Sequence, residues 1–132
     1  MPLEDLAYYL NERTSGRLAE IGVGFQFKVA LTLRSLGRDV FVVDWNPKAV
    51  ERARELGLRA FRDDVFNPRL ELYTGVGAIY AVRPTPEIIK PILELGRKLE
   101  VPVIILPLSG DRVPRGMRLE NYRGLAIYSK GI

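Results

Sequence analysis

Apolar runs alternate with segments of helical periodicity along the whole chain, and this alternation predicts the fold. Short apolar runs that end in glycine or polar residues are typical of buried parallel strands, and we expect strands at Arg17–Ile21, Val40–Val43, Leu58–Arg62, Val76–Val82, Val101–Leu108 and Ala126–Ser129. Apolar residues spaced three and four apart predict helices at Leu3–Glu12, Phe25–Leu36, Pro47–Leu56 and Glu87–Leu99. Strands alternating with helices of these lengths predict an α/β fold with a doubly wound, mostly parallel sheet in three layers, α/β/α.

A single domain, residues 1–132, accounts for the whole sequence. With 47% hydrophobic and 27% charged residues, a chain of this length can bury a core without disulfides, and it contains neither an internal repeat nor a linker. The longest apolar run, 101–108, is interrupted by two prolines and is too short to span a bilayer. The N-terminus has no basic segment leading into an apolar one, so we expect a cytoplasmic protein with no membrane contacts.

The composition excludes several kinds of chemistry. There is no cysteine and no histidine, which removes thiol nucleophiles, imidazole acid–base catalysis and Cys/His zinc sites, so no metal site is expected. A single glutamine, two methionines and many arginines and glutamates form a bias typical of hyperthermophiles. The formal net charge is +4, and the last quarter gathers Arg112, Arg115, Arg118 and Arg123. A solvated charged rim is favoured over an RNA-binding surface, because no aromatic residues interleave with these arginines. Homo-oligomers are left open.

A glycine-containing turn after the first strand indicates a nucleotide-binding unit. Glu20-Ile21-Gly22-Val23-Gly24-Phe25 ends that strand, and Asp44 follows Gly24 by twenty residues at the end of the second strand. In such a βαβ unit the glycines let the backbone approach a ligand, and the acid accepts hydrogen bonds from ribose hydroxyls. Gln26 stands where a third glycine is expected for a dinucleotide, which favours a ligand without a pyrophosphate.

Polar residues at the ends of the strands are the candidates for a site, because ligands of such sheets bind outside the carboxyl ends of the strands. These candidates are Glu20, Gly22, Gly24, Asp44, Trp45, Asp63, Asp64, Tyr80, Arg83, Thr85, Ser109 and Asp111. A carboxylate at Glu20 would repel a pyrophosphate but attract an ammonium or a sulfonium group. It therefore favours S-adenosylmethionine over NAD; the alternative is that Glu20 caps a loop amide or pairs with an arginine.

Three segments resemble the motifs of class I S-adenosylmethionine-dependent methyltransferases. Glu20–Gly24 resembles their first motif, Asp44-Trp45 their second and Asp63-Asp64-Val65 their third. The whole chain is also similar to a small archaeal family of uncharacterised proteins with a methyltransferase-like Rossmann core, most clearly over residues 80–87.

The resemblance implies a role for each matching residue. Gly22 and Gly24 would line the methionine part of the cofactor, Glu20 would face its amino group, and Asp44 would hold the ribose hydroxyls. Trp45 would lie against adenine, and Asp64 would accept from the adenine amino group. Phe25 and Val65, which adjoin these motifs, complete the predicted cofactor-binding residues. A core position for Trp45 and a solvated loop for the two aspartates are the alternatives.

The fourth strand departs from the methyltransferase pattern. It ends in Arg83-Pro84-Thr85-Pro86 instead of the Asn/Asp-Pro-Pro-aromatic sequence of amino-group methyltransferases. Arg83 is only a hydrogen-bond donor and cannot act as a base, but it could hold a substrate carboxylate or phosphate. Arg83, Tyr80 and Thr85 are therefore candidates for residues acting on a substrate. Alternatively, the prolines shape the turn and Arg83 points into solvent.

A second resemblance supports a different function. Residues 22–64 are also similar to the NAD-binding regulatory domains of potassium-uptake systems, whereas Glu20 and the missing third glycine favour the methyltransferase. Two hypotheses follow: an enzyme that transfers a methyl group from S-adenosylmethionine to a small molecule or RNA, and a non-catalytic module that senses NAD or an adenosyl compound.

Overall fold

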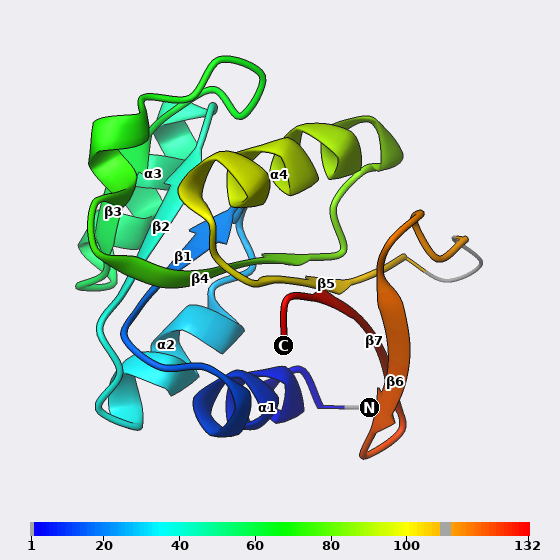
Figure 1. Ribbon diagram of the computed structural model, residues 1–132. Coiled ribbons are helices and arrows are strands. Elements are labelled where there is room, and N and C mark those ends of the chain that lie inside the picture. Colours follow the sequence, from blue (N-terminus) through cyan, green and yellow to red (C-terminus); the bar gives the residue numbers. More distant parts are fainter. Residues whose placement is uncertain (1, 109–111) are drawn as a thin grey trace.

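A seven-stranded sheet lies between two layers of helices (Figure 1). The computed structural model describes residues 2–108 and 112–132. In chain order the elements are α1 Glu4–Arg13, β1 Arg17–Ile21, α2 Lys28–Ser35, β2 Val40–Asp44, α3 Pro47–Glu55, β3 Arg59–Arg62, the 3₁₀ helix η1 Leu70–Tyr73, β4 Val76–Val82, α4 Pro86–Leu99, β5 Val103–Leu106, β6 Arg118–Tyr122 and β7 Leu125–Lys130. Within these described ranges, no helix is long and apolar enough to cross a membrane.

The strand order places the first strand near the middle of the sheet. The order is β3-β2-β1-β4-β5-β7-β6, with β1 to β5 mutually parallel and β7 antiparallel to both of its neighbours. The chain therefore reverses its direction of winding between β3 and β4, beside β1. The carboxyl ends of β1, β2 and β4 meet at this switch point, where ligands of open α/β sheets bind.

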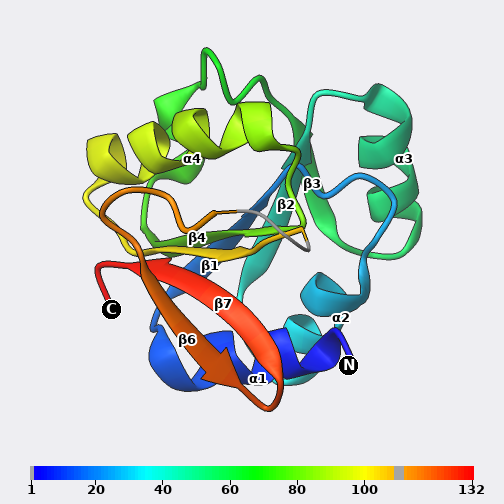
Figure 2. The same ribbon diagram turned by 90° about the vertical axis from the view of Figure 1, so that its right-hand side faces the viewer.

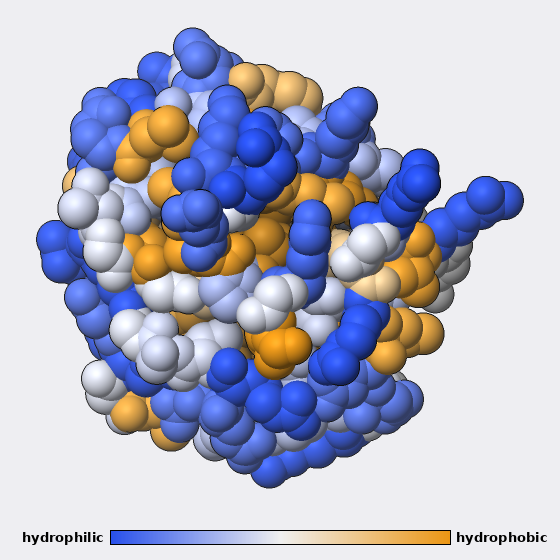
Figure 3. Space-filling view, in the orientation of Figure 1, coloured by the Kyte–Doolittle hydropathy of each residue, from blue (hydrophilic) through white to orange (hydrophobic). Residues whose placement is uncertain are grey.

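Alternate residues of the strands face two separate apolar clusters. Leu18 of β1 faces the cluster covered by α1, α2 and α3, whereas Ala19 and Ile21 face the cluster covered by α4 and η1. Figure 2 shows α4 on one side of the sheet and α1 and α2 on the other. In the space-filling view, hydrophobic side chains show between α4 and the strands below it, on a face that is otherwise mostly hydrophilic (Figure 3).

The N-terminal helix is joined to the C-terminal hairpin. Glu120 of β6 accepts hydrogen bonds from the Tyr9 hydroxyl at 3.1 Å and from Arg13 Nη2 at 2.8 Å. In the turn between β6 and β7, the Arg123 guanidinium contacts Asp5 of α1 at 3.1 Å. These contacts fasten the edge strand β6, which buries little of its own surface, to helix α1.

The predicted three-layer α/β fold with a mostly parallel sheet is confirmed, and its elements differ from the prediction at a few boundaries. The second helix begins at Lys28 instead of Phe25, because Gly22 and Gly24 adopt left-handed backbone angles and residues 24–25 form a turn. The fifth strand is limited to Val103–Leu106, since a proline flanks it on each side. Strand β6 and helix η1 were not predicted; β6 is an exposed edge strand and has no clear apolar alternation.

Candidate functional site

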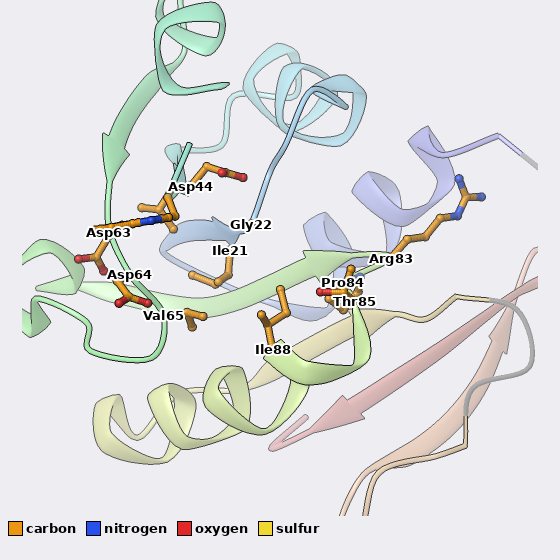
Figure 4. A pocket seen from close by; sticks show the side chains of 12 residues that line it. Ile21, Gly22, Asp44, Asp63, Asp64, Val65, Arg83, Pro84, Thr85 and Ile88 are labelled. Carbon is orange, nitrogen blue, oxygen red and sulfur yellow. The ribbon is translucent and has the colours of Figure 1, made fainter. Parts of the chain in front are cut away.

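A cavity of about 340 Å³ opens at the carboxyl ends of the central strands, next to the first turn of α4 (Figure 4). Residues from the ends of β1, β2 and β4, from the loop after β3, and from the start of α4 line it: Ile21, Gly22, Val43, Asp44, Trp45, Asp63, Asp64, Val65, Arg83, Pro84, Thr85 and Ile88. Apolar side chains lie in the middle of the view, with Asp63 and Asp64 on one side and Thr85 on the other. Its volume is in the range of about 300–1,000 Å³ that is usual for small-molecule sites.

The glycine turn after β1 forms one wall of this cavity. Gly22 and Gly24 have φ angles of 68° and 58°, in the left-handed region that residues with side chains rarely adopt. The amides of Gly22 and Val23 both donate to the Val43 carbonyl, which holds the turn against the end of β2. A Cβ atom on Gly22 would lie 3.3 Å from Cδ1 of Ile88, so glycine keeps this side of the cavity open.

Asp44 links the glycine turn to the loop after β2. Its Oδ2 accepts a hydrogen bond from the Gly24 amide at 2.7 Å, and its Oδ1 accepts one from the Asn46 amide at 2.8 Å. A carboxylate has about four lone-pair sites, so two of them are free for ligand hydroxyls. Asn46 in turn accepts from the Lys48 amide and caps α3, as the Asn-Pro sequence predicts.

Trp45 presents an exposed indole ring at the cavity. Its side chain is 60% exposed, although it is the largest apolar group of the lining. The guanidinium carbon of Arg62 lies 4.1 Å from the centroid of the ring, and Arg62 Nε donates to the Trp45 carbonyl at 2.8 Å. Trp45 is therefore a surface residue held by Arg62 and does not belong to the core.

The two aspartates after β3 have different surroundings. Asp63 is 6% exposed and accepts hydrogen bonds from the backbone and Nε of Arg69, each at 3.2 Å, and from the Tyr73 hydroxyl at 3.0 Å. Burial, together with the neighbouring Asp63 carboxylate, raises the pKa of Tyr73, which stays a hydrogen-bond donor. The Asp64 side chain is half-buried and, among the described residues, accepts one hydrogen bond, from the Phe66 amide at 2.9 Å. Asp63 thus organises the loop, and Asp64 has capacity left for a ligand.

Glu20 and Tyr80 form a buried pair behind the glycine turn. Both side chains are fully buried, and the Tyr80 hydroxyl donates to Glu20 Oε1 at 2.7 Å. Glu20 Oε2 has no hydrogen-bond partner among the described residues. Burial raises the pKa of Glu20 to about 8, with a further contribution from Asp44, although the hydrogen bond from Tyr80 acts in the opposite direction. The carboxyl group is therefore mostly protonated at neutral pH.

The end of β4 contributes the remaining wall of the cavity. Arg83 and Thr85 both line it, and the Arg83 backbone has a φ of 49°, which is unusual for a residue other than glycine. The Arg83 amide donates to the Leu106 carbonyl at 2.6 Å, which fixes the strand end. The Arg83 side chain is exposed and points away from the acidic residues in Figure 4.

The structure brings most of the predicted site residues together. Gly22, Asp44, Trp45, Asp64 and Val65 line one cavity with the catalytic candidates Arg83 and Thr85. Gly24 is not among the described residues that line the cavity, but its amide donates to Asp44, which is. Phe25 is 61% exposed and packs edge-on against Phe27.

Other candidates lie elsewhere. Among the described residues, Glu20 and Tyr80 do not line the cavity. Ser109 and Asp111 lie outside the described residues. Arg62 was not predicted. It lies beside the site because it pairs with Asp44 in the adjacent strand, and this register cannot be read from the sequence alone.

Comparison with known proteins identifies the family. A model of the "Uncharacterised protein family (UPF0146)" matches residues 3–131. The chain belongs to the UPF0146 family. A UPF0146 protein of Pyrococcus horikoshii is 52% identical over 113 residues, 86% of each chain. A UPF0146 protein of Methanocaldococcus jannaschii is 38% identical over 128 residues, 97% of this chain and 93% of the relative. These relatives are archaeal and their names place them in thermophilic genera, as the composition predicts.

Several solved structures with a similar fold are methyltransferases. The UPF0146 chain is similar to a TehB-like SAM-dependent methyltransferase from Corynebacterium glutamicum, with a TM-score of 0.71, 16% identity and coverage of 98% and 89% of the two chains. It is also similar to an RNA methyltransferase from Salinibacter ruber in complex with S-adenosyl-L-homocysteine, with a TM-score of 0.70, 16% identity and coverage of 98% and 91%.

Larger methyltransferases share the fold over part of their length. The UPF0146 chain spans 57% of the CcbJ methyltransferase from Streptomyces caelestis, at a TM-score of 0.67, 18% identity and 92% coverage of this chain. It spans 56% of the glycopeptide N-methyltransferase MtfA complexed with S-adenosyl-L-methionine, at a TM-score of 0.64, 13% identity and 92% coverage of this chain. At these identities the likeness establishes a methyltransferase-like Rossmann fold.

Proposed function

We propose that this protein binds S-adenosylmethionine, or its demethylated product, in the cavity at the ends of β1, β2 and β4. The observation that carries the proposal is the position of Asp44. Its carboxylate accepts from the Gly24 amide at 2.7 Å and borders the same cavity as Gly22, Trp45 and Asp64. A glycine turn, a strand-end acid and an aromatic ring are thus assembled around one space of suitable size.

Each wall of the cavity has a part of the cofactor to hold. Asp44 would accept the ribose hydroxyls with its free lone pairs, and Trp45 would pack against adenine. Asp64 and Val65 follow β3 on the same side and would contact the far edge of the base. The turn at Gly22, which has no side chain to fill the space near Ile88, would accommodate the methionine part.

The charges around the cavity favour a cationic ligand over a dinucleotide. The carboxylates of Asp44, Asp63 and Asp64 line it. The sulfonium and ammonium groups of S-adenosylmethionine complement such a site. The pyrophosphate of NAD would meet these carboxylates, and the exposed Arg83 side chain points away from them.

Bound S-adenosylmethionine would supply an activated methyl group on its sulfonium. The residues of this chain would act mainly by holding cofactor and acceptor in alignment, since proximity and orientation alone can supply much of a transfer reaction's rate. Thr85 and the backbone of Arg83 border the cavity at the end of β4 and are placed to contact an acceptor. An RNA acceptor stays a prediction from the sequence.

Calorimetric titration of the purified protein with S-adenosylmethionine, S-adenosylhomocysteine and NAD tests the proposal. We expect saturable binding of both adenosyl compounds and markedly weaker binding of NAD. Saturable NAD binding without a response to either adenosyl compound would refute the proposal. Asp39→Ala provides a matched control for any variant of Asp44, because Asp39 is an exposed acid before the amino end of β2, away from the cavity.

A non-catalytic sensing module is the second candidate, and one observation favours it. Tyr80 is buried against Glu20, and Arg83 and Thr85 are poor bases, so the described residues at the end of β4 offer no group to take a proton. An assay of methyl transfer from labelled S-adenosylmethionine to archaeal cell extract separates the two functions. Cofactor binding without transfer to any fraction would favour the module.

A further inference from the structure

One arginine makes two contacts with the exposed tryptophan of the cavity. The Arg62 guanidinium stacks on the Trp45 ring with 4.1 Å between guanidinium carbon and ring centroid, and Arg62 Nε donates to the Trp45 carbonyl at 2.8 Å. The first contact restrains the orientation of the ring, and the second restrains the backbone that carries it. An exposed indole without such contacts would sample several rotamers.

The sheet brings this arginine to the tryptophan. Asp44 and Arg62 are register partners at the ends of the parallel strands β2 and β3, and Trp45 is the next residue after Asp44. The carbonyl of Arg62 accepts a hydrogen bond from Arg69 Nη2, and Arg69 is paired with the buried Asp63. The end of β3 is therefore fixed by the loop that also supplies Asp64 and Val65 to the cavity.

The guanidinium that contacts the Trp45 ring lies outside the set of described residues that line the cavity. Trp45 lines the cavity, whereas Arg62 is absent from the described residues that line it. Arg62 instead borders a neighbouring hollow together with residues of α3 such as Val50 and Glu51. Trp45 therefore borders the cavity while its arginine partner does not, and the ring stays 60% exposed beside that partner.

We propose that Arg62 is a positioning residue that holds Trp45 as a ready-made stacking platform for the purine base of the ligand. The inference rests on the proposed function, because Asp44, the immediate neighbour of Trp45, is assigned to the ribose to which that base is attached. Holding the ring in place before binding removes part of the ordering cost that the ligand would otherwise meet. The stacked cation also draws electron density from the indole, which favours a neutral, electron-rich base on the opposite face.

Trp45 is the single tryptophan of the chain, so intrinsic fluorescence reports on the platform directly. We would measure emission and time-resolved anisotropy of the wild type, Arg62→Ala, Arg62→Lys and Arg59→Ala while titrating adenosine and S-adenosylhomocysteine, with homocysteine as a probe that lacks a base. Arg59 is the matched control, since it is an exposed arginine at the other end of β3. Melting curves establish that each variant is folded, as the exposure of Arg62 leads us to expect.

The expected results are specific to a platform. Adenosine and S-adenosylhomocysteine should change Trp45 emission in the wild type, and homocysteine should not. Arg62→Ala should increase local motion of Trp45 and weaken both base-containing ligands by the same factor, roughly five- to thirtyfold. Arg62→Lys, which keeps the charge, should recover part of this loss, and Arg59→Ala should behave as the wild type.

Two failures are distinguishable. If the wild type binds adenosine and S-adenosylhomocysteine but Arg62→Ala matches Arg59→Ala in anisotropy and affinity, the platform is refuted while the cofactor proposal stands. If the wild type binds neither compound, the cofactor proposal fails and the platform fails with it.

Discussion

The hydroxyl of Tyr80 donates a 2.7 Å hydrogen bond to Oε1 of Glu20, and both side chains are fully buried between the sheet and the helices behind the glycine turn. The second carboxyl oxygen has no partner among the described residues. A buried carboxyl with one donor is stable in its protonated form and costly in its charged form, because desolvation disfavours the charge. The Glu20 carboxyl therefore keeps its proton at neutral pH, close to the candidate ligand site.

The first prediction concerns stability and pH. Burial raises the pKa of Glu20 to about 8 in the folded protein, well above its ordinary value of 4.5, so between these two pH values the folded state binds more protons than the unfolded state. The contribution of Glu20 to the free energy of unfolding is then fully present below about pH 4.5 and is lost as the pH rises toward 8. This loss is on the order of a few kcal/mol. Glu20→Gln should flatten this dependence in denaturant unfolding measured from pH 5 to 9, while Glu51→Gln, at an exposed position of α3, should not.

The second prediction links ligand binding to the same proton. A cationic ligand near Glu20 stabilises the carboxylate, so binding should lower its pKa and release protons at neutral pH. Affinity for S-adenosylmethionine should therefore rise between about pH 6 and 8. Calorimetry in buffers of different ionisation enthalpy measures the released protons directly. Equal proton release by wild type and Glu20→Gln would show that another group is responsible.

The third prediction concerns Asp44, whose two oxygens join the glycine turn to the start of α3. Asp44→Ala should weaken binding of S-adenosylhomocysteine by roughly 1.5–3 kcal/mol for each charge-assisted bond to ribose that is lost. It should also speed amide exchange at Gly24, which loses its acceptor. Asp39→Ala should change neither quantity. Full affinity in a folded Asp44→Ala protein would place the ligand elsewhere.

Most of the fold follows from local patterns of the sequence. The apolar runs predict β1, β2 and β4 closely because these central strands are buried on both faces, and Asn46-Pro47 marks the start of α3. Strand β6 escapes prediction because it is an exposed edge strand that pairs with β7 alone, and the side chains that contact its Glu120 are Tyr9 and Arg13 of α1, more than a hundred residues away. An edge strand held by distant partners has little apolar pattern of its own.

Site residues could be predicted from the sequence only where their position at the end of a strand was enough to identify them. Glycines and acids at strand ends pointed to Gly22, Asp44 and Asp64, which the sheet brings to one cavity. The contacts that set each side chain's role depend on neighbours distant in sequence. Nothing near Tyr80 in the chain indicates that its hydroxyl is used by Glu20, sixty residues earlier.

The fourth prediction compares the two glycines of the turn. Both have positive φ, so alanine at either position should cost roughly 1–2 kcal/mol of stability. They differ in the space around them: a Cβ on Gly22 would crowd Ile88 at 3.3 Å inside the cavity, whereas a Cβ on Gly24 would meet nothing within 4 Å. Gly22→Ala should therefore reduce S-adenosylhomocysteine affinity more than Gly24→Ala at similar melting temperatures. The reverse order would exclude Gly22 from the ligand surface.

The fifth prediction separates an enzyme from a binding module through Arg83. Its side chain is exposed, it makes no ion pair within the described residues, and it points away from the acidic side of the cavity. Removing it should therefore leave the fold and the cofactor affinity nearly unchanged. If the chain transfers methyl groups to an anionic acceptor, Arg83→Ala should lose turnover on cell extract while S-adenosylmethionine still binds. If the chain is a module, the variant should match the wild type in every assay.

Two further variants decide what a loss of turnover at Arg83 means. The backbone there has a φ of 49°, a conformation that costs an ordinary residue about 1–2 kcal/mol and glycine almost nothing. Arg83→Gly should therefore be at least as stable as Arg83→Ala, although glycine also gains freedom in the unfolded chain. Arg52→Ala, at an exposed position on α3, controls for loss of positive charge alone. Turnover lost in both Arg83 variants but kept in Arg52→Ala would assign the guanidinium to the acceptor. Destabilisation of Arg83→Ala with cofactor binding intact would instead show a structural role and remove Arg83 from the site.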